Sequence, residues 1–246
     1  MKLLLIAIYL VFYFLVGIFI NIEIRTLQKK DPVEAYHVSN RIVRHAFNRI
    51  LQLAGVRRIV KGAENIPSET ALYVGNHRSY FDILTTHVTI KQPIGYVAKA
   101  EMTNIPFLAQ WMKNIGCLFL DRKDNKKALK TILDGANMLK SGQVSLFIFP
   151  EGTRGHGDGI APFKKGSFKM AERAQVPIVP VGIIGTDKIF ENNGAFRKVR
   201  GGKVYLNFGK PIDTTNLTSE QKRHIDSYVQ NIVADLIQEL KDEYHL

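Results

Sequence analysis

Hydrophobic and polar residues follow one pattern near the start of the chain and another in the rest of it. Residues 3–20 form an unbroken apolar run. As a helix this run measures about 27 Å, just short of the hydrocarbon core of a bilayer. It is too long for the core of a signal peptide, and no small-residue cleavage site follows it. We therefore expect a retained helix that either spans a membrane or lies within one leaflet.

A second helix is predicted to follow the first and to end near Leu53. Asp31 is its expected N-cap, with Pro32 at the first helical position and Glu34 at the third. Its apolar positions recur at helical spacing. Its other faces carry the arginines Arg41, Arg44 and Arg49. The sequence thus predicts a membrane-associated helical hairpin over residues 1–55.

After residue 55, short β-rich runs alternate with helical patterns. Strands are predicted at 56–61, 71–75, 94–98, 115–121, 144–149, 177–184 and 203–208. Helices are predicted at 79–89, 106–114, 125–140, 167–174 and 219–239, the last with an apolar stripe suited to a protein core. This alternation predicts an α/β fold with a mixed, largely parallel sheet flanked by helices. We expect it to form a second domain over residues 56–246.

The composition limits the class of protein and the class of partner. Hydrophobic residues make up 46% of the chain, which is enough for a substantial core. The single cysteine excludes a disulfide within the chain and suits a reducing compartment. A net charge of +12 implies acidic partners such as anionic lipid, nucleic acid or an acidic carrier protein. Because no recognised nucleic-acid motif is present, we expect no nucleic-acid partner.

Positive charge is concentrated after the first helix. Six Arg or Lys residues lie between Glu34 and Glu64, a stretch without an acid. Beside an apolar anchor, each such cation adds about 1 kcal/mol of attraction to an anionic leaflet. A basic face in contact with solvent is the alternative, and the adjoining apolar run favours the membrane. If the first helix spans, the basic excess after it places the C-terminal domain on the cytoplasmic face of the membrane.

The candidate chemistry centres on the segment from Asn76 to Asp82, which follows a predicted strand closed by Gly75. A strand, a turn and a helix are expected here, and open α/β sheets place ligand sites at such strand ends. His77 lies on the turn. Ser79 is the expected N-cap, so the carboxylate of Asp82 falls in the first helical turn and can reach back to His77. A carboxylate on one imidazole nitrogen leaves the other nitrogen as a base.

Structural alternatives exist for these residues. Ser79 and Asp82 also fit a capping box, which would explain the aspartate without chemistry. No serine or cysteine is positioned beside His77 as a nucleophile, so the proton it removes is expected to come from a substrate hydroxyl. A zinc site of His77, Asp82 and His87 lacks recognisable ligand spacing. Cys117 lies in an apolar run, where a buried thiol is expected.

Two arginines indicate an anion site. Arg122 follows the apolar run 117–120, and Arg154 follows the turn after 144–149. Both leave predicted strands at an edge that His77 could share. Guanidinium groups match phosphate oxygens in a bidentate manner, so two that converge would suit a phosphomonoester. Arginines in surface salt bridges are the alternative.

The residues around Arg154 suggest further contacts. Glu151 would repel a phosphate, so we expect it to orient an arginine or to accept from a substrate hydroxyl. Gly152 allows close backbone approach, and Thr153 offers a hydroxyl donor. A following loop could cover the site or be merely solvated, and it contains Gly155, Gly157, Gly159, Lys164 and Lys165.

Four short blocks stand out in the α/β part of the sequence. They are NHRSYFD at 76–82, GCLFLDR at 116–122, FPEGTR at 149–154 and VPIVPV at 176–181. Together and in this order, the blocks resemble those of the glycerolipid acyltransferase family, the first with a histidine and an aspartate separated by four residues. The similarity runs from about Lys61 to about Gly209.

The resemblance implies a reaction and its participants. The expected reaction transfers an acyl chain from a thioester of acyl carrier protein or coenzyme A to 1-acylglycerol-3-phosphate (lysophosphatidic acid), giving phosphatidic acid. His77 and Asp82 would be catalytic, while the acceptor would be bound by Arg122, Glu151, Gly152, Thr153 and Arg154. We expect no metal or tightly bound cofactor, because the thioester is already activated. Acylation of glycerol-3-phosphate or another lysophospholipid, and a non-enzymatic module that binds anionic lipid, remain alternatives.

Overall fold

A single sheet forms the centre of the structure. The computed structural model describes residues 1–155, 159–191 and 198–246. Within these ranges the sheet has seven strands in the order β1-β7-β6-β2-β5-β3-β4. They are β1 (Val56–Lys61), β2 (Leu72–Gly75), β3 (Ile94–Lys99), β4 (Leu118–Leu120), β5 (Ser145–Ile148), β6 (Ile178–Ile184) and β7 (Gly202–Phe208). Neighbouring strands are parallel except for β6 and β7, so the predicted mixed, largely parallel sheet is confirmed.

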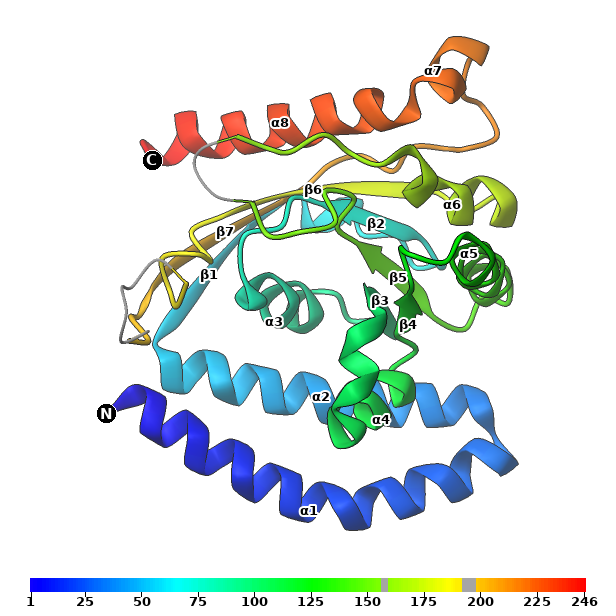
Figure 1. Ribbon diagram of the computed structural model, residues 1–246. Helices are drawn as coiled ribbons and strands as arrows, with labels where there is room; N and C mark the ends of the chain where they lie inside the picture. The colour runs from blue at the N-terminus through cyan, green and yellow to red at the C-terminus, as the bar shows by residue number, and fades with distance from the viewer. Residues whose placement is uncertain (156–158, 192–197) are drawn as a thin grey trace.

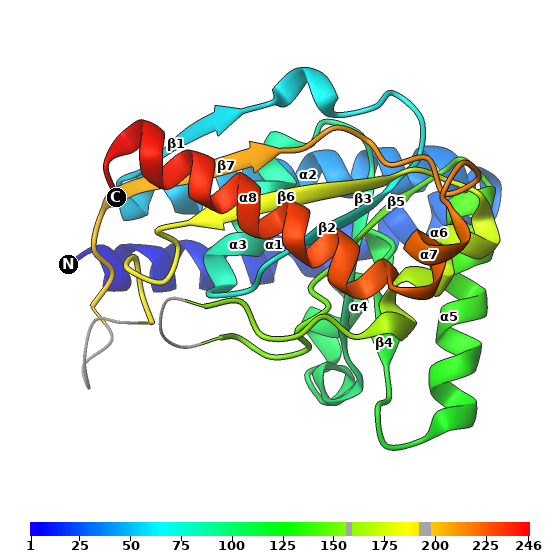
Figure 2. The ribbon, with the colours of Figure 1, turned by 90° about the horizontal axis from the view of Figure 1, so that it is seen from above.

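Helices cover both faces of this sheet (Figure 1). The α-helices are α1 (Lys2–Lys30), α2 (Pro32–Ala54), α3 (Tyr80–Thr89), α4 (Pro106–Asn114), α5 (Asn125–Lys140), α6 (Lys169–Ala174), α7 (Ser219–Arg223) and α8 (Ile225–Tyr244). Short 3-10 helices are η1 (Ala63–Asn65), η2 (Ala100–Asn104) and η3 (Lys165–Phe168). In Figure 1, α8 lies above the sheet, α2 and α3 lie below it, and α1 is outermost. Figure 2 shows α8 crossing over the strands.

Two element boundaries differ from the sequence prediction. The strand predicted at 115–121 is only Leu118–Leu120. Ile115 still caps the end of α4, and Gly116 turns the chain with a φ of 85°. The helix predicted at 219–239 is interrupted at His224, whose φ of −118° and ψ of 36° separate α7 from α8. Hydrophobic periodicity reports the buried face of an element and is insensitive to such a local turn.

The N-terminal hairpin is present, and its first helix extends beyond the predicted residue 20 to Lys30. The extension is held by polar contacts with α4, since Asn114 donates to Asn21 at 2.6 Å and accepts from Gln28 at 3.3 Å. Lys2 closes the other end of the hairpin by donating to the carbonyl of Ala54 at 3.0 Å. These partners lie far apart in sequence, which is why the apolar pattern alone gave too short a helix.

The outward face of α1 exposes large apolar side chains. Leu4, Phe12 and Phe19 are 64%, 63% and 73% exposed. Among the described residues, α1 is the one helix that is long and apolar enough to cross a membrane, judged by length and composition. By contrast, the apolar stripe predicted for the last helix is buried against the sheet, through residues such as Val229 and Val233.

The two faces of the sheet bury different hydrophobic clusters. Leu72 and Val74 of β2 point toward α8 and pack in a cluster with Val233. Tyr73 points to the opposite face, where its cluster includes Val43 of α2. The predicted division of the chain at residue 55 stays a prediction. Because Val43 and Tyr73 belong to one hydrophobic cluster, the face of α2 that is turned toward the sheet is nevertheless part of the protein core.

Asn40 joins α2 to the sheet by hydrogen bonds. Its side chain is 1% exposed, and its Oδ1 accepts from the backbone N–H of Ile94 at 2.9 Å. Its Nδ2 donates to the carbonyls of Tyr36 and Ile115 at 3.0 and 3.4 Å. One side chain therefore connects α2 to the start of β3 and to the end of α4.

Asn40→Ala should destabilise the protein because it leaves the buried N–H of Ile94 without an acceptor. We expect the free energy of unfolding to fall by about 1–3 kcal/mol, measured by denaturant unfolding of the full chain in detergent. Asn48→Ala, a change on the same helix, is the control and should alter it by less than about 0.5 kcal/mol. Equal effects of the two substitutions would show that α2 is not held through Asn40.

Candidate active site

Three segments that carry predicted site residues meet at one edge of the sheet. His77 follows β2, Arg122 follows β4, and Glu151 follows β5. The strands β2, β5, β3 and β4 are adjacent and mutually parallel, so their carboxyl ends lie on the same side. The predicted common edge is therefore confirmed. Ligand sites of open α/β sheets are found at this position.

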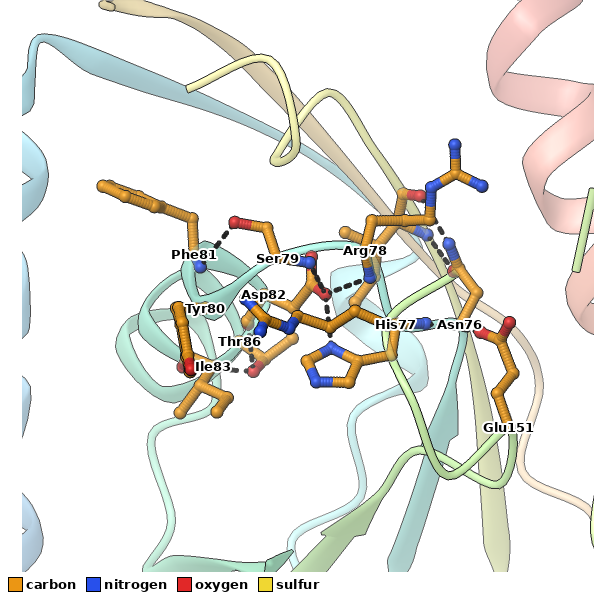
Figure 3. A network of polar contacts seen from close by, with 12 residues as sticks. Asn76, His77, Arg78, Ser79, Tyr80, Phe81, Asp82, Ile83, Thr86 and Glu151 are labelled. Atoms are coloured by element: carbon orange, nitrogen blue, oxygen red, sulfur yellow. Dashed lines mark hydrogen bonds and ion pairs between the residues drawn. The ribbon is translucent and has the colours of Figure 1, made fainter. Parts of the chain in front are cut away.

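His77 and Asp82 form a hydrogen-bonded pair at the start of α3 (Figure 3). The Nδ1 atom of His77 lies 2.8 Å from Oδ2 of Asp82. The same oxygen accepts from the backbone N–H of Arg78 at 2.7 Å and of Ser79 at 2.8 Å. Asp82 is fully buried, whereas the His77 side chain keeps 16% of its surface exposed. The carboxylate reaches back over the turn as the sequence predicted.

The hydrogen bonds of Asp82 determine which nitrogen of His77 carries the proton. A carboxylate that already accepts two backbone N–H groups can bond Nδ1 only as an acceptor, so Nδ1 carries the hydrogen. Nε2 then keeps its lone pair and can act as a base. The capping box is also present, because Ser79 accepts from the first turn of α3 and Asp82 accepts from Ser79. The structural and the chemical interpretation of Asp82 therefore hold together.

The ring and backbone of His77 are held from several sides. Its imidazole stacks on Phe149, with ring centres 4.1 Å apart and an angle of 16° between the planes. Its neighbour Asn76 exchanges hydrogen bonds with the backbone of Ile183 on β6, at 2.9 Å and 2.8 Å. Packing and hydrogen bonding together fix the position of the imidazole before any substrate binds.

Glu151 supports the His77 turn from the adjacent loop. One carboxylate oxygen accepts from the backbone N–H of His77 at 2.7 Å, and the other accepts from Ala161 at 2.9 Å. Burial raises the pKa of this carboxyl, and these hydrogen bonds oppose the rise. The sequence predicted a contact with an arginine or with an acceptor hydroxyl; in the structure each oxygen accepts from a backbone amide, and the charge of Arg78 also acts on this carboxyl. Glu151 is thus placed to fix the loop geometry around His77.

Gly152 lies where two cationic side chains meet. Its φ is 77°, a conformation that favours glycine, and a Cβ atom there would lie 2.7 Å from Nη1 of Arg122 and 2.8 Å from Nζ of Lys164. Arg122 donates to the carbonyl of Gly152. Thr153, the next residue, is exposed. The cation that accompanies Arg122 is therefore Lys164, from the loop whose part in the site the sequence left open.

Arg154 has different partners from Arg122. Its Nη1 lies 3.3 Å from a carboxylate oxygen of Glu191, and its guanidinium lies 4.2 Å above the ring of Tyr80. Glu191 also accepts from the Ser79 hydroxyl at 2.6 Å and from the Tyr80 N–H at 2.9 Å, which holds the start of α3. The predicted pair of arginines thus shares an edge of the sheet but not a hydrogen-bond partner. Sequence reasoning missed Glu191 because it belongs to no recognised block.

Other candidate residues lie away from this site or outside the described residues. Cys117 is buried, and burial raises the pKa of its thiol to about 12, as expected for a structural thiol. His87 is buried, and burial lowers its pKa to about 3. In the described part of the chain, no group of three or more His, Cys, Asp or Glu could hold a metal ion. Gly157 of the predicted loop falls outside the described residues.

Comparisons with known proteins find the same family throughout. The family model described as Acyltransferase matches residues 57–184. The 1-acyl-sn-glycerol-3-phosphate acyltransferase of Escherichia coli (strain K12) is 32% identical over 81% of this chain and 80% of its own length. The enzyme of that name from Saccharomyces cerevisiae is 30% identical over 83% of this chain and 68% of its own. The crystal structure of the 1-acyl-sn-glycerophosphate (LPA) acyltransferase from Thermotoga maritima matches with a TM-score of 0.73 and 27% identity, over 98% of each chain.

Glu151→Gln should destabilise the loops around His77. A glutamine has one acceptor oxygen, so one of the two backbone N–H groups now bound loses its partner. We expect the free energy of unfolding to fall by about 1–3 kcal/mol in a urea titration. Glu69→Gln replaces an exposed carboxylate and should change it by less than about 0.5 kcal/mol. A Glu151→Gln protein as stable as this control would contradict the supporting role.

Proposed function

This chain belongs to the acyltransferase family, and from that premise we propose that it acylates the free hydroxyl of 1-acylglycerol-3-phosphate. The acyl chain would come from a thioester of acyl carrier protein or of coenzyme A, and the product would be phosphatidic acid. The curated relatives named above support the acceptor, since their names state that substrate. The observation that carries the proposal is the His77–Asp82 pair, in which Nδ1 is occupied and Nε2 is available.

In the proposed reaction, His77 acts as a general base. Nε2 removes the proton from the acceptor hydroxyl while the hydroxyl oxygen attacks the carbonyl carbon of the thioester. A tetrahedral intermediate forms, and its collapse breaks the C–S bond. The imidazolium returns the proton to the departing sulfur, so the products are an ester and a free thiol. The charge of Asp82 stabilises the imidazolium while it exists.

The base accounts for part of the rate enhancement. A positioned general base contributes about 10²- to 10⁴-fold, so alignment of the two substrates and stabilisation of the oxyanion must supply the rest. The stacking of His77 on Phe149 and the hydrogen bonds of Asn76 and Glu151 support alignment, because they hold the imidazole in one orientation. The reaction needs no metal or bound cofactor, since the thioester is already an activated acyl group.

We assign the binding of the acceptor phosphate to the cations beside the catalytic dyad of His77 and Asp82. Arg122 and Lys164 converge at Gly152, which has no side chain to push the two cations apart. Arg154 adds a third cation at the start of α3, and Thr153 adds an exposed hydroxyl. A phosphate that binds Arg154 must compete with Glu191 for its guanidinium. Bidentate binding would favour the phosphate in that competition.

We also propose that α1 anchors the protein in a membrane. Its exposed apolar face supports this placement, because large side chains such as Phe19 are otherwise in contact with water. The basic residues of α2 are suited to anionic headgroups. This arrangement would bring the site to an acceptor that resides in the bilayer. The excess of basic residues after α1 favours the cytoplasmic face.

Replacing His77 by Ala should lower kcat at least about 10²-fold with both donors, because the base is lost while the fold is kept. Asp82→Asn should also be severely impaired, since an amide does not stabilise the imidazolium as an ion does. His37→Ala, at an exposed histidine of α2, and Cys117→Ala are controls and should retain turnover. Near-normal turnover of His77→Ala would end the general-base proposal.

Arg154→Ala should impair acylation of the phosphorylated acceptor and leave acylation of a monoacylglycerol nearly unchanged. The monoacylglycerol has the same reacting hydroxyl but no phosphate for the guanidinium to bind. Arg154→Lys keeps the charge without the planar fork and should fall between wild type and Arg154→Ala.

The measurement is kcat/KM for both acceptors with wild type and Arg154→Ala, and Arg173→Ala on the exposed surface of α6 is the control. If both acceptors lose activity by the same factor, Arg154 supports the fold or the donor instead of the phosphate.

A further inference from the structure

A second cationic site lies away from the His77–Asp82 dyad, between α2, the C-terminal end of α3 and the edge strand β1. It is a pocket of about 450 Å³ whose polar lining consists of Arg41, Arg44, His45, Asn48, Arg58 and Lys91. Val88, in the last turn of α3, completes the lining. Asp82 is in the first turn of the same helix, so the pocket and the dyad lie at opposite ends of α3.

The charge in this pocket is not balanced by the protein. The described residues that line it include four permanently charged cations and no carboxylate. The chain has no acid between Glu34 and Glu64, the stretch that supplies three of these cations. Among the described residues, no ion pair involves Arg41, Arg44, Arg58 or Lys91. A concave surface with several uncompensated cations attracts an anion.

Two of the arginines are held in place before any ligand arrives. Arg44 donates to the carbonyls of His87, Ile90 and Gln92 at 3.3, 3.1 and 3.0 Å, using Nε and Nη2. Arg58 donates through Nη1 to the Thr89 hydroxyl at 3.0 Å. Both side chains are partly buried, and this burial lowers the pKa of their guanidinium groups. Their remaining N–H groups are oriented by the same hydrogen bonds, which reduces the entropy lost on binding.

The other two cations form the rim of the pocket. Arg41 and Lys91 are exposed, whereas Arg44 and Arg58 are partly buried. An anion that enters thus meets the exposed charges first and the oriented guanidinium groups below them. Several guanidinium and ammonium groups around one small cavity suit the oxygens of a phosphate better than a single carboxylate.

The position of the pocket indicates where this phosphate comes from. Four of its seven lining residues come from α2, which packs against α1 along the hairpin seen in Figure 1. The face of α1 that bears Leu4, Phe12 and Phe19 is exposed and apolar. The inference rests on the proposed anchoring of α1: with that face in a bilayer, α2, which packs against α1, would lie beside the layer of lipid headgroups. From this geometry we propose that the pocket binds the headgroup phosphate of an anionic membrane lipid, at a site separate from that of the acceptor.

The test compares the loss of two charges inside the pocket with the loss of two charges outside it. The pocket variant is Arg41→Gln with Lys91→Gln, which spares the arginines that hold α3. The matched control is Arg49→Gln with Arg57→Gln, two exposed arginines that do not line the pocket. Binding of each full-length protein is measured by vesicle flotation, without substrates. The vesicles are phosphatidylcholine mixed with phosphatidylglycerol or, at matched surface potential, with oleate.

We expect the pocket variant to lose at least about tenfold more affinity than the control for phosphatidylglycerol vesicles. On oleate vesicles, whose excess negative charge lies on a carboxylate instead of a phosphate, the two variants should lose affinity equally. Because no acceptor or donor is present, this result is independent of the proposed reaction. If the pocket variant and the control lose affinity equally on phosphatidylglycerol vesicles as well as on oleate vesicles, the pocket is only part of a diffuse basic surface and the proposal is wrong.

Two further measurements distinguish a lipid headgroup from other negatively charged ligands. Inorganic phosphate, compared with chloride at equal ionic strength, should compete only weakly with phosphatidylglycerol vesicles. Strong competition that is lost in the pocket variant would mean that the site binds a free phosphate. If the pocket variant binds vesicles like the control but raises KM for an acyl carrier protein donor, the site belongs to the carrier and the proposal is wrong.

Discussion

The structure of this site depends on one oxygen atom of a buried carboxylate. Oδ2 of Asp82 accepts from the backbone of Arg78 and Ser79 and from the ring of His77, so a single atom both starts α3 and orients the base. The two roles reinforce each other, because the backbone amides hold the carboxylate in place while it accepts from His77. A general base built on a turn thereby gains the rigidity of a helix end.

The neighbouring loops are tied to this point by acids that contact backbone rather than substrate. Glu151 joins the loop after β5 to the amide of His77, and Glu191 joins the segment after β6 to the start of α3. Glu191 also pairs with Arg154, which connects the fixed base to a cation proposed to bind the acceptor. Alignment of the hydroxyl with His77 would therefore depend on side chains from three separate segments.

Local features of the site could be predicted from the sequence, and long-range ones could not. His77 and Asp82 are separated by one turn, so helix capping rules were sufficient to bring them together. Glu191 lies 112 positions from Ser79, and nothing in its surroundings marks it. The backbone partners of Glu151 could not be predicted, because a carboxylate looks the same in a sequence whether it meets a guanidinium or an amide. Alternating patterns gave the sheet, but the turn at Gly116 that shortens β4 is invisible to them.

The central claim is that Asp82 keeps the proton of His77 on Nδ1 and leaves Nε2 as the base. The most direct measurement is the pair of ¹⁵N chemical shifts of the His77 ring in the full-length protein at neutral pH, assigned by comparison with His77→Gln. We expect a protonated Nδ1 and an unprotonated Nε2, and we expect this preference to disappear in Asp82→Asn. A neutral ring with its proton on Nε2 in the wild-type protein would contradict the account.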